Sequence, residues 1–127
     1  MIILVAAAGV LAALIAPAGS ASPSTRAASF SPCDISGKQQ QLGASYVNSL
    51  KVQGVSCGKA EKVIKAYHQC RHANGGPAGH CPTPVIGFNC KDGTRTGVPN
   101  VQYDARAKCR KAANPARRIK SAYTQNT

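Results

Sequence analysis

Six cysteines limit the folds open to this chain more than any other feature of its sequence. They are Cys33, Cys57, Cys70, Cys81, Cys90 and Cys109. An even number of cysteines in a short chain that follows an apolar leader is typical of three disulfides. We therefore expect a small disulfide-stapled domain. Oxidised cysteines are poor metal ligands and poor nucleophiles, because both roles need a thiolate.

The start of the chain predicts export. Residues 1–16, "MIILVAAAGVLAALIA", carry no charge and precede "PAGSASPSTRAAS", a run of small residues. This stretch is shorter than the roughly 20 apolar residues of a membrane-spanning helix and is typical of a signal peptide. We predict a signal peptide over 1–21, a secreted protein and no stable membrane insertion after cleavage. A retained anchor is the alternative.

The stretch "GVSCGKAEKVIKAYHQCRH", residues 54–72, carries a helical pattern. Apolar residues recur at helical spacing from Cys57 to Cys70, and Ser56 can cap the first turn. The two cysteines lie near opposite ends, about 20 Å apart, so each needs a different partner. The polar side of the helix carries Lys59, Lys62 and Lys65.

Three further segments alternate as strands do. Residues 44–52, "ASYVNSLKV", place Tyr46, Leu50 and Val52 on one face, and residues 82–90 alternate less regularly. Residues 101–110, "VQYDARAKCR", separate an apolar face from Val101 to Cys109 from a charged one. The last two segments form a predicted hairpin around a long loop containing Asp-Gly and Pro.

The order strand-helix-strand-strand predicts class α+β, with one helix packed on a small antiparallel sheet. We expect a flexible arm over 22–32, the disulfide-stabilised domain over 33–111, and a loose basic tail over 112–127. Cys70 and Cys81 bracket the turn-rich loop "HANGGPAGHCP", so we expect them to bond. Cys57 would then pair with Cys90 or Cys109 and Cys33 with the other, an order that stays open.

Charge offers the best indication of a partner. Sixteen Lys and Arg face only four Asp and Glu, which gives a net charge of +12. Such a balance attracts anionic polymers or acidic proteins. The candidate basic binding surface comprises Lys59, Lys62, Lys65, Arg106, Lys108 and Arg110. The alternative is that these residues are the solvated faces of amphipathic elements. Trp is absent and Phe occurs twice, so the chain lacks a platform for base stacking and we expect no specific nucleic-acid partner. We also expect a monomer.

Neither metal binding nor catalysis is the favoured interpretation. His68 and His72 could lie on one side of a helix with His80 nearby, but the following glycines and proline favour a helix that ends early, with exposed histidines. Glu61 and His68 could serve a small ribonuclease, yet their backbones would be about 10 Å apart. We expect no metal, no cofactor and no catalytic residue.

Three motifs occur along residues 44–111: "VQGVSCGKAEKV" at the start of the helical segment, then "GFNC", then "YDARAKCRK" in a strand with a further cysteine. In these motifs, V-x-G-V-S-C-x-x-A-x-x-V, G-F-x-C and the cysteine-bearing strand, the chain resembles small exported proteins of actinobacteria. The resemblance implies a stapled helix and a hairpin, and no activity.

Together these observations favour a secreted, non-enzymatic domain that binds an anionic envelope component or an acidic protein. An inhibitor or effector module that presents the 91–100 loop is the alternative. A small secreted ribonuclease comes third.

Overall fold

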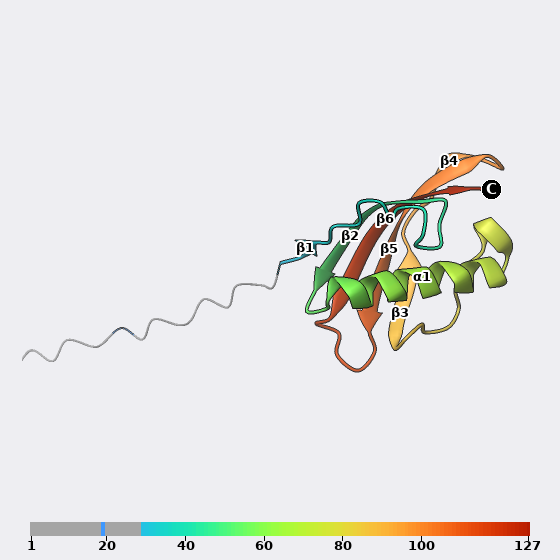
Figure 1. The fold of residues 1–127 in the computed structure, drawn as a ribbon. Coiled ribbons are helices and arrows are strands. Elements are labelled where there is room, and N and C mark those ends of the chain that lie inside the picture. Colours follow the sequence, from blue (N-terminus) through green and yellow to red (C-terminus); the bar gives the residue numbers. More distant parts are fainter. Residues whose placement is uncertain (1–18, 20–28) are drawn as a thin grey trace, which may run out of the picture.

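The computed structural model describes Gly19 and residues 29–127, and in this part of the chain one helix packs on one face of a six-stranded antiparallel sheet (Figure 1). The α+β, disulfide-stapled fold is confirmed. The helix is α1 (Cys57–Ala73), followed by the short 3-10 turn η1 (Gly76–Ala78). The strands are β1 (Ser31–Pro32), β2 (Tyr46–Gln53), β3 (Phe88–Asp92), β4 (Thr96–Val98), β5 (Gln102–Lys111) and β6 (Arg118–Asn126). The predicted signal peptide and residues 22–28 of the predicted arm lie outside the described residues, Gly19 excepted.

The sheet has the order β1-β2-β6-β5-β3, with β4 paired to β5 beyond the end of β3. The predicted order of strands was therefore incomplete. The expected loose tail over 112–127 is wrong, because most of it forms β6, which pairs with β2 on one side and β5 on the other. The end of the predicted arm is also ordered, since Ser31–Pro32 pairs with β2. The domain thus runs from β1 to the end of β6.

Helix α1 begins as the sequence predicts. The Ser56 side chain accepts a hydrogen bond from the Lys59 backbone N–H at 3.2 Å. The helix continues through Ala73, however, so the expectation that it ends before His72 is wrong. Asn74 closes its last turn, donating from its side chain to the Cys70 carbonyl at 2.8 Å. The buried face of the helix consists of Ala60, Val63, Ile64, Tyr67, His68 and Arg71.

A β-bulge in β2 changes which residues face the core. The pairing of β2 with β6 shifts register between Val47 and Ser49. As a result Val47 and Leu50 are both buried, whereas Tyr46, predicted on the core face, is 41% exposed. An extra residue in one strand reverses the alternation on one side of it, and simple period-two reading cannot detect this.

The predicted hairpin is present, with β5 alternating as expected. Tyr103, Ala105, Ala107 and Cys109 are buried. Val101 is 58% exposed and lies before the strand. At the other side of the hairpin, Ile86 and Gly87 have positive φ angles and form a turn, so β3 begins only at Phe88.

The disulfides confirm one expected pair and correct the others. Cys70 bonds Cys81, as predicted. Cys33 bonds Cys57, and Cys90 bonds Cys109. Cys90 and Cys109 are direct cross-strand neighbours in β3 and β5, so they are close enough to bond. Cys57 therefore bonds Cys33, the remaining cysteine. Within residues 29–127, no helix is long and apolar enough to cross a membrane.

Candidate functional site

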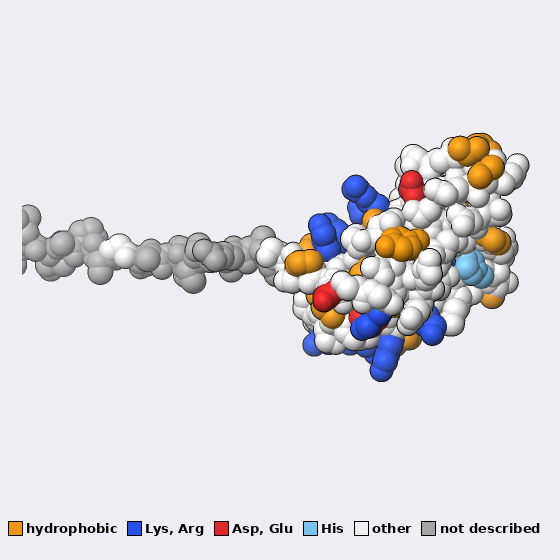
Figure 2. Space-filling model, turned by 45° about the horizontal axis from the view of Figure 1, so that its top comes forward, with side chains coloured by type: hydrophobic (Ala, Val, Ile, Leu, Met, Phe, Trp, Pro, Cys, Tyr) orange, Lys and Arg blue, Asp and Glu red, His pale blue; other side chains and the backbone are white. Residues whose placement is uncertain are grey.

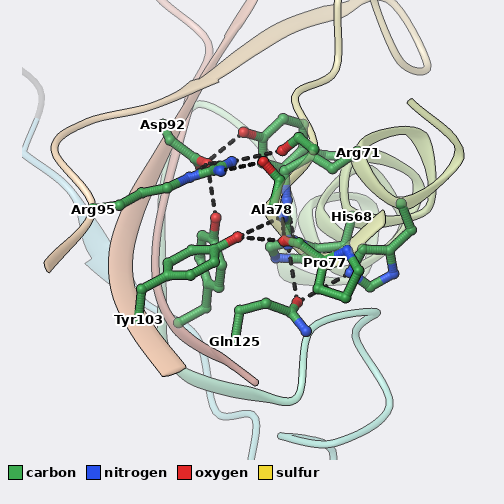
Figure 3. A network of polar contacts seen from close by, with 12 residues as sticks. His68, Arg71, Pro77, Ala78, Asp92, Arg95, Tyr103 and Gln125 are labelled. Carbon is green, nitrogen blue, oxygen red and sulfur yellow. Dashed lines mark hydrogen bonds and ion pairs between the residues drawn. The ribbon is translucent and has the colours of Figure 1, made fainter. Parts of the chain in front are cut away.

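A polar network lies buried between the end of α1 and the sheet (Figure 3). Its centre is Arg71, which is fully buried. The Arg71 guanidinium donates to the Pro77 carbonyl at 2.9 Å, the Tyr103 hydroxyl at 2.8 Å and the Gln125 side-chain oxygen at 3.1 Å. It also lies 4.9 Å from the ring centroid of Tyr123. A buried charge needs such partners, because its desolvation is expensive.

His68 is a second buried member of this network. Its Nδ1 accepts a hydrogen bond from Arg71 Nε at 3.1 Å, and its ring packs against the edge of Tyr123. Burial, with the charge of Arg71 adding to it, lowers the pKa of His68 to about 3. His68 is therefore a neutral acceptor at physiological pH. The expectation of an exposed His68 at a frayed helix end is wrong.

The other two histidines that were considered as metal ligands do not gather around His68. His72 lies partly buried, with its Nε2 3.0 Å from the side-chain oxygen of Gln125, and His80 is exposed. Over the described residues, the structure contains no group of three His, Cys, Asp or Glu side chains that could hold a metal ion.

Asp92 closes the network on the side of the sheet. Its carboxylate accepts hydrogen bonds from the Tyr67 hydroxyl at 2.7 Å and the Tyr123 hydroxyl at 2.8 Å, and it pairs with Arg95 at 2.8 Å. Burial acts to raise the pKa of Asp92, but the hydrogen bonds outweigh it and the pKa lies below its usual value. Arg95 also donates to the Ala78 carbonyl, which ties η1 to the sheet. The network thus joins helix, turn and sheet.

The pair suggested for a ribonuclease is not assembled. Glu61 pairs with Lys38 at 3.1 Å, outside the network. His68 is fully buried and faces Arg71. A substrate could not reach that imidazole without displacing the helix, so the geometry assigns it a structural role.

The outer face of the sheet, opposite α1, carries a row of four lysines. Lys51 lies directly opposite Lys120, Lys120 opposite Lys108, and Lys108 opposite Lys91, across β2, β6, β5 and β3. We call these four residues the lysine row. Neighbouring strands lie about 4.8 Å apart, so the row spans about 14 Å. All four lysines are exposed.

Three arginines extend this positive surface. Arg110 lies directly opposite Arg118, two residues along the strands from the row, and Arg106 lies two residues away on its other side in β5. We call the lysine row with these arginines the basic face: Lys51, Lys91, Arg106, Lys108, Arg110, Arg118 and Lys120. Across the part of the chain that the structure describes, the only ion pairs are Lys38–Glu61 and Arg95–Asp92, neither on this face. Like charges directly opposite each other destabilise a sheet, so the fold gains nothing from this arrangement.

The basic face is hollowed rather than flat. Two adjoining grooves of about 580 Å³ and 400 Å³ share Phe30, Lys108 and Lys120 in their walls. The first reaches Lys91 in β3 and the second reaches Lys51 in β2, so together they cross the sheet along the lysine row. Phe30 lies between them, with its ring centroid 4.2 Å from Lys120 Nζ.

The structure separates the six basic residues that the sequence grouped together. Lys59, Lys62 and Lys65 are exposed on α1, whereas Arg106, Lys108 and Arg110 point from the opposite face of the sheet. Figure 2 accordingly shows Lys and Arg side chains gathered at two separate edges of the view. They are not one surface.

Sequence reasoning missed four members of the basic face: Lys51, Lys91, Arg118 and Lys120. Lys51 lies in the segment 44–52 predicted as a strand, whose alternation could have placed it on the polar side. Lys91 is the first residue of the predicted 91–100 loop, which the structure replaces with the end of β3. Arg118 and Lys120 lie in the segment predicted as a tail, so nothing placed them beside β5.

No protein-family model, curated protein or solved structure matches this chain.

Proposed function

We propose that this protein is a secreted, non-enzymatic domain that binds an anionic partner on the basic face of its sheet. The observation that carries the proposal is the lysine row, in which four like charges are neighbours across four strands. Such an arrangement opposes folding unless another molecule neutralises it. The resemblance to small exported actinobacterial proteins and the three disulfides support the proposed location outside the cell.

The proposal is tested by two variants with the same net charge. One carries Lys51→Gln, Lys108→Gln and Lys120→Gln on the sheet, and the other carries Lys59→Gln, Lys62→Gln and Lys65→Gln on the helix. Binding to heparin, an anionic probe, is measured at several salt concentrations. We expect the sheet variant to bind about tenfold more weakly, since each exposed charge pair contributes a fraction of a kcal/mol. The helix variant should bind nearly as the unaltered protein does.

Equal loss in both variants would show that net charge alone drives binding, without a site. Undiminished binding by the sheet variant would contradict the proposal. The thermal unfolding of both variants is recorded first, so that a folding defect is not mistaken for lost binding.

One observation favours the inhibitor or effector module as a second candidate. The hairpin of β4 and β5 projects from the end of the sheet and exposes two apolar side chains, Val98 at 61% and Val101 at 58% (Figure 1). Its base is fixed by Arg95, and Gly97 approaches the backbone of β5 too closely for any side chain. A salt-independent protein partner lost with Val98→Ser, but kept with Lys108→Gln, would favour this candidate.

A further inference from the structure

The basic face lacks the apolar anchors of a protein-docking surface. Protein partners derive most of their affinity from aromatic or aliphatic side chains that fill pockets near the centre of the interface. On the basic face the one aromatic side chain is Phe30, and Lys120 already packs against its ring. The other apolar side chains of the first groove that are at least partly exposed, Cys90, Ala112 and Pro115, are small, and the charged groups of both grooves are ammonium and guanidinium groups.

The shape of the basic face favours a linear ligand over a flat one. The two grooves adjoin and together follow the lysine row across the strands, from Lys91 in β3, over Lys108 and Lys120, to Lys51 in β2. A planar bilayer would contact the rims of such a hollow and leave its floor unfilled. A flexible chain can follow this line across the strands and meet each lysine in turn.

The density and type of the charges indicate the chemistry of that chain. Residues 106–110 of β5 extend about 14 Å along the strand, and the lysine row extends about 14 Å across it, so seven cations occupy a small area. A ligand that neutralises them needs a charge in nearly every unit. The ammonium group of Lys is a compact charge and lacks the planar, two-pronged donor geometry of the Arg guanidinium. It can therefore bind phosphate oxygens that approach from any direction.

Nucleic acid fits this surface less well. Proteins that bind single strands combine a basic groove with several aromatic side chains on which bases stack. Phe30 is the one aromatic side chain that lines either groove, and it contacts Lys120. The surface therefore offers contacts to a backbone and little to bases.

We propose that the ligand of the basic face is a linear phosphate chain without bases, of the inorganic polyphosphate type, which lies in the two adjoining grooves over the lysine row. This inference rests on the proposed function and specifies its ligand. The phosphates bind the ammonium groups of Lys91, Lys108, Lys120 and Lys51, and the flanking arginines hold the chain within the groove.

The test uses the full chain with its disulfides intact and calorimetric titration. The probes are inorganic polyphosphate, poly-glutamate and poly(glycerol phosphate) of equal charge number, and single-stranded oligothymidylate. We expect polyphosphate to bind about tenfold more tightly than each of the others, and pyrophosphate to bind weakly because it cannot span the row. The logarithm of the binding constant should fall linearly with the logarithm of salt concentration.

A matched pair of variants locates the contacts. Lys108→Gln, in the middle of the row, should lower the salt slope for polyphosphate by about 0.7, the value for one lost phosphate contact on a single strand. Lys62→Gln on the helix, with the same charge change, should leave the slope unaltered.

The outcomes separate this inference from the proposed function. If another probe binds more tightly than polyphosphate, and Lys108→Gln weakens that binding, the inference of a phosphate-chain ligand is wrong. The basic face would still be the binding site. If no probe distinguishes Lys108→Gln from Lys62→Gln, the proposed function fails together with the inference.

Discussion

His68 and Arg71 hold the end of α1 on the sheet through one hydrogen-bonded network. The Arg71 guanidinium is accommodated in a fully buried site because carbonyl, hydroxyl and amide oxygens accept hydrogen bonds from it and a tyrosine ring faces it. His68 must remain neutral there, since its Nδ1 accepts a hydrogen bond from Arg71 Nε. At the scale of single residues, then, a titratable group has been fixed in one protonation state.

This state makes stability depend on pH. The folded pKa of His68 is about 3, below the usual value of about 6.5 in an unfolded chain. Below pH 6.5 the His68 side chain takes up a proton in the unfolded state but not in the folded state. The contribution of the neutral His68 to folding stability is therefore complete above pH 6.5 and is lost as pH falls toward 3. We expect the free energy of unfolding to fall by up to about 1.4 kcal/mol per pH unit from this group. Urea titrations between pH 5 and 7.5 measure it.

The control is His68→Gln, which keeps an acceptor for Arg71 and does not titrate. It should flatten the slope over this range, above the region where carboxyl groups take up protons. Asp92 and His72 also act on the imidazole electrostatically, so the direct check is the NMR titration of the His68 ring in the folded protein. A midpoint near 6.5 there would contradict the burial argument.

The sequence could not place these residues because their surroundings come from distant segments. Tyr103 and Gln125 lie 32 and 54 positions after Arg71. Helical spacing does put His68 and Arg71 on the same side as Val63, Ile64 and Tyr67, and this signal was available. Polar residues on the apolar face of a helix more often lie at its border, where they remain exposed. Here β6 packs against that border and buries both residues.

Among the helix and the longer strands, β6 is the element that the sequence pattern failed to predict. Its inward side chains are Ile119, Ser121, Tyr123 and Gln125, of which two are polar. Two basic residues and a nearby proline favour the reading as a tail. By contrast, the apolar residues of α1 recur at helical spacing, and those of β5 alternate with charged or polar residues. Both elements were predicted to within a few residues of their bounds.

A proline in the middle of β6 tests its central position. Ala122 lies opposite Ser49 in β2 and Arg106 in β5, so backbone hydrogen bonds leave β6 on both sides there. Ala122→Pro removes a ladder donor and should abolish cooperative unfolding, because proline is excluded from central strands. Ala122→Val, a residue that suits strands, should keep the fold. Circular dichroism during heating compares them, and near-native melting of the proline variant would support a loose tail instead.

For the whole molecule, the fold class and the Cys70–Cys81 disulfide follow from the sequence, whereas the other two disulfide pairs and the arrangement of charge do not. Cys70 and Cys81 could be paired because a turn-rich loop separates them. Lys91 and Lys108 pair within the predicted hairpin, but Lys120 and Lys51 join them only because β6 lies between β5 and β2. Net charge indicated an anionic partner without indicating where it binds.

The lysine row predicts that binding and stability oppose each other. Lys108 has a lysine directly opposite on each side, Lys91 and Lys120. Cross-strand pairs of like charge destabilise and pairs of opposite charge stabilise by about 0.2–1 kcal/mol each. Lys108→Gln should therefore raise the free energy of unfolding slightly, and Lys108→Glu should raise it more, by about 1 kcal/mol, while both weaken binding of the anionic probe.

Thermal unfolding at low and high salt measures this order. About 1 kcal/mol corresponds to a rise of roughly 4–8 °C in Tm for a domain of this size. The advantage of Lys108→Glu should shrink in high salt, because exposed charges are screened beyond about one Debye length. A lower Tm for Lys108→Glu than for the unaltered protein would mean that the lysines of the row do not repel each other. The strain that we ascribe to the unliganded sheet, and with it the main reason to expect a ligand there, would then be absent.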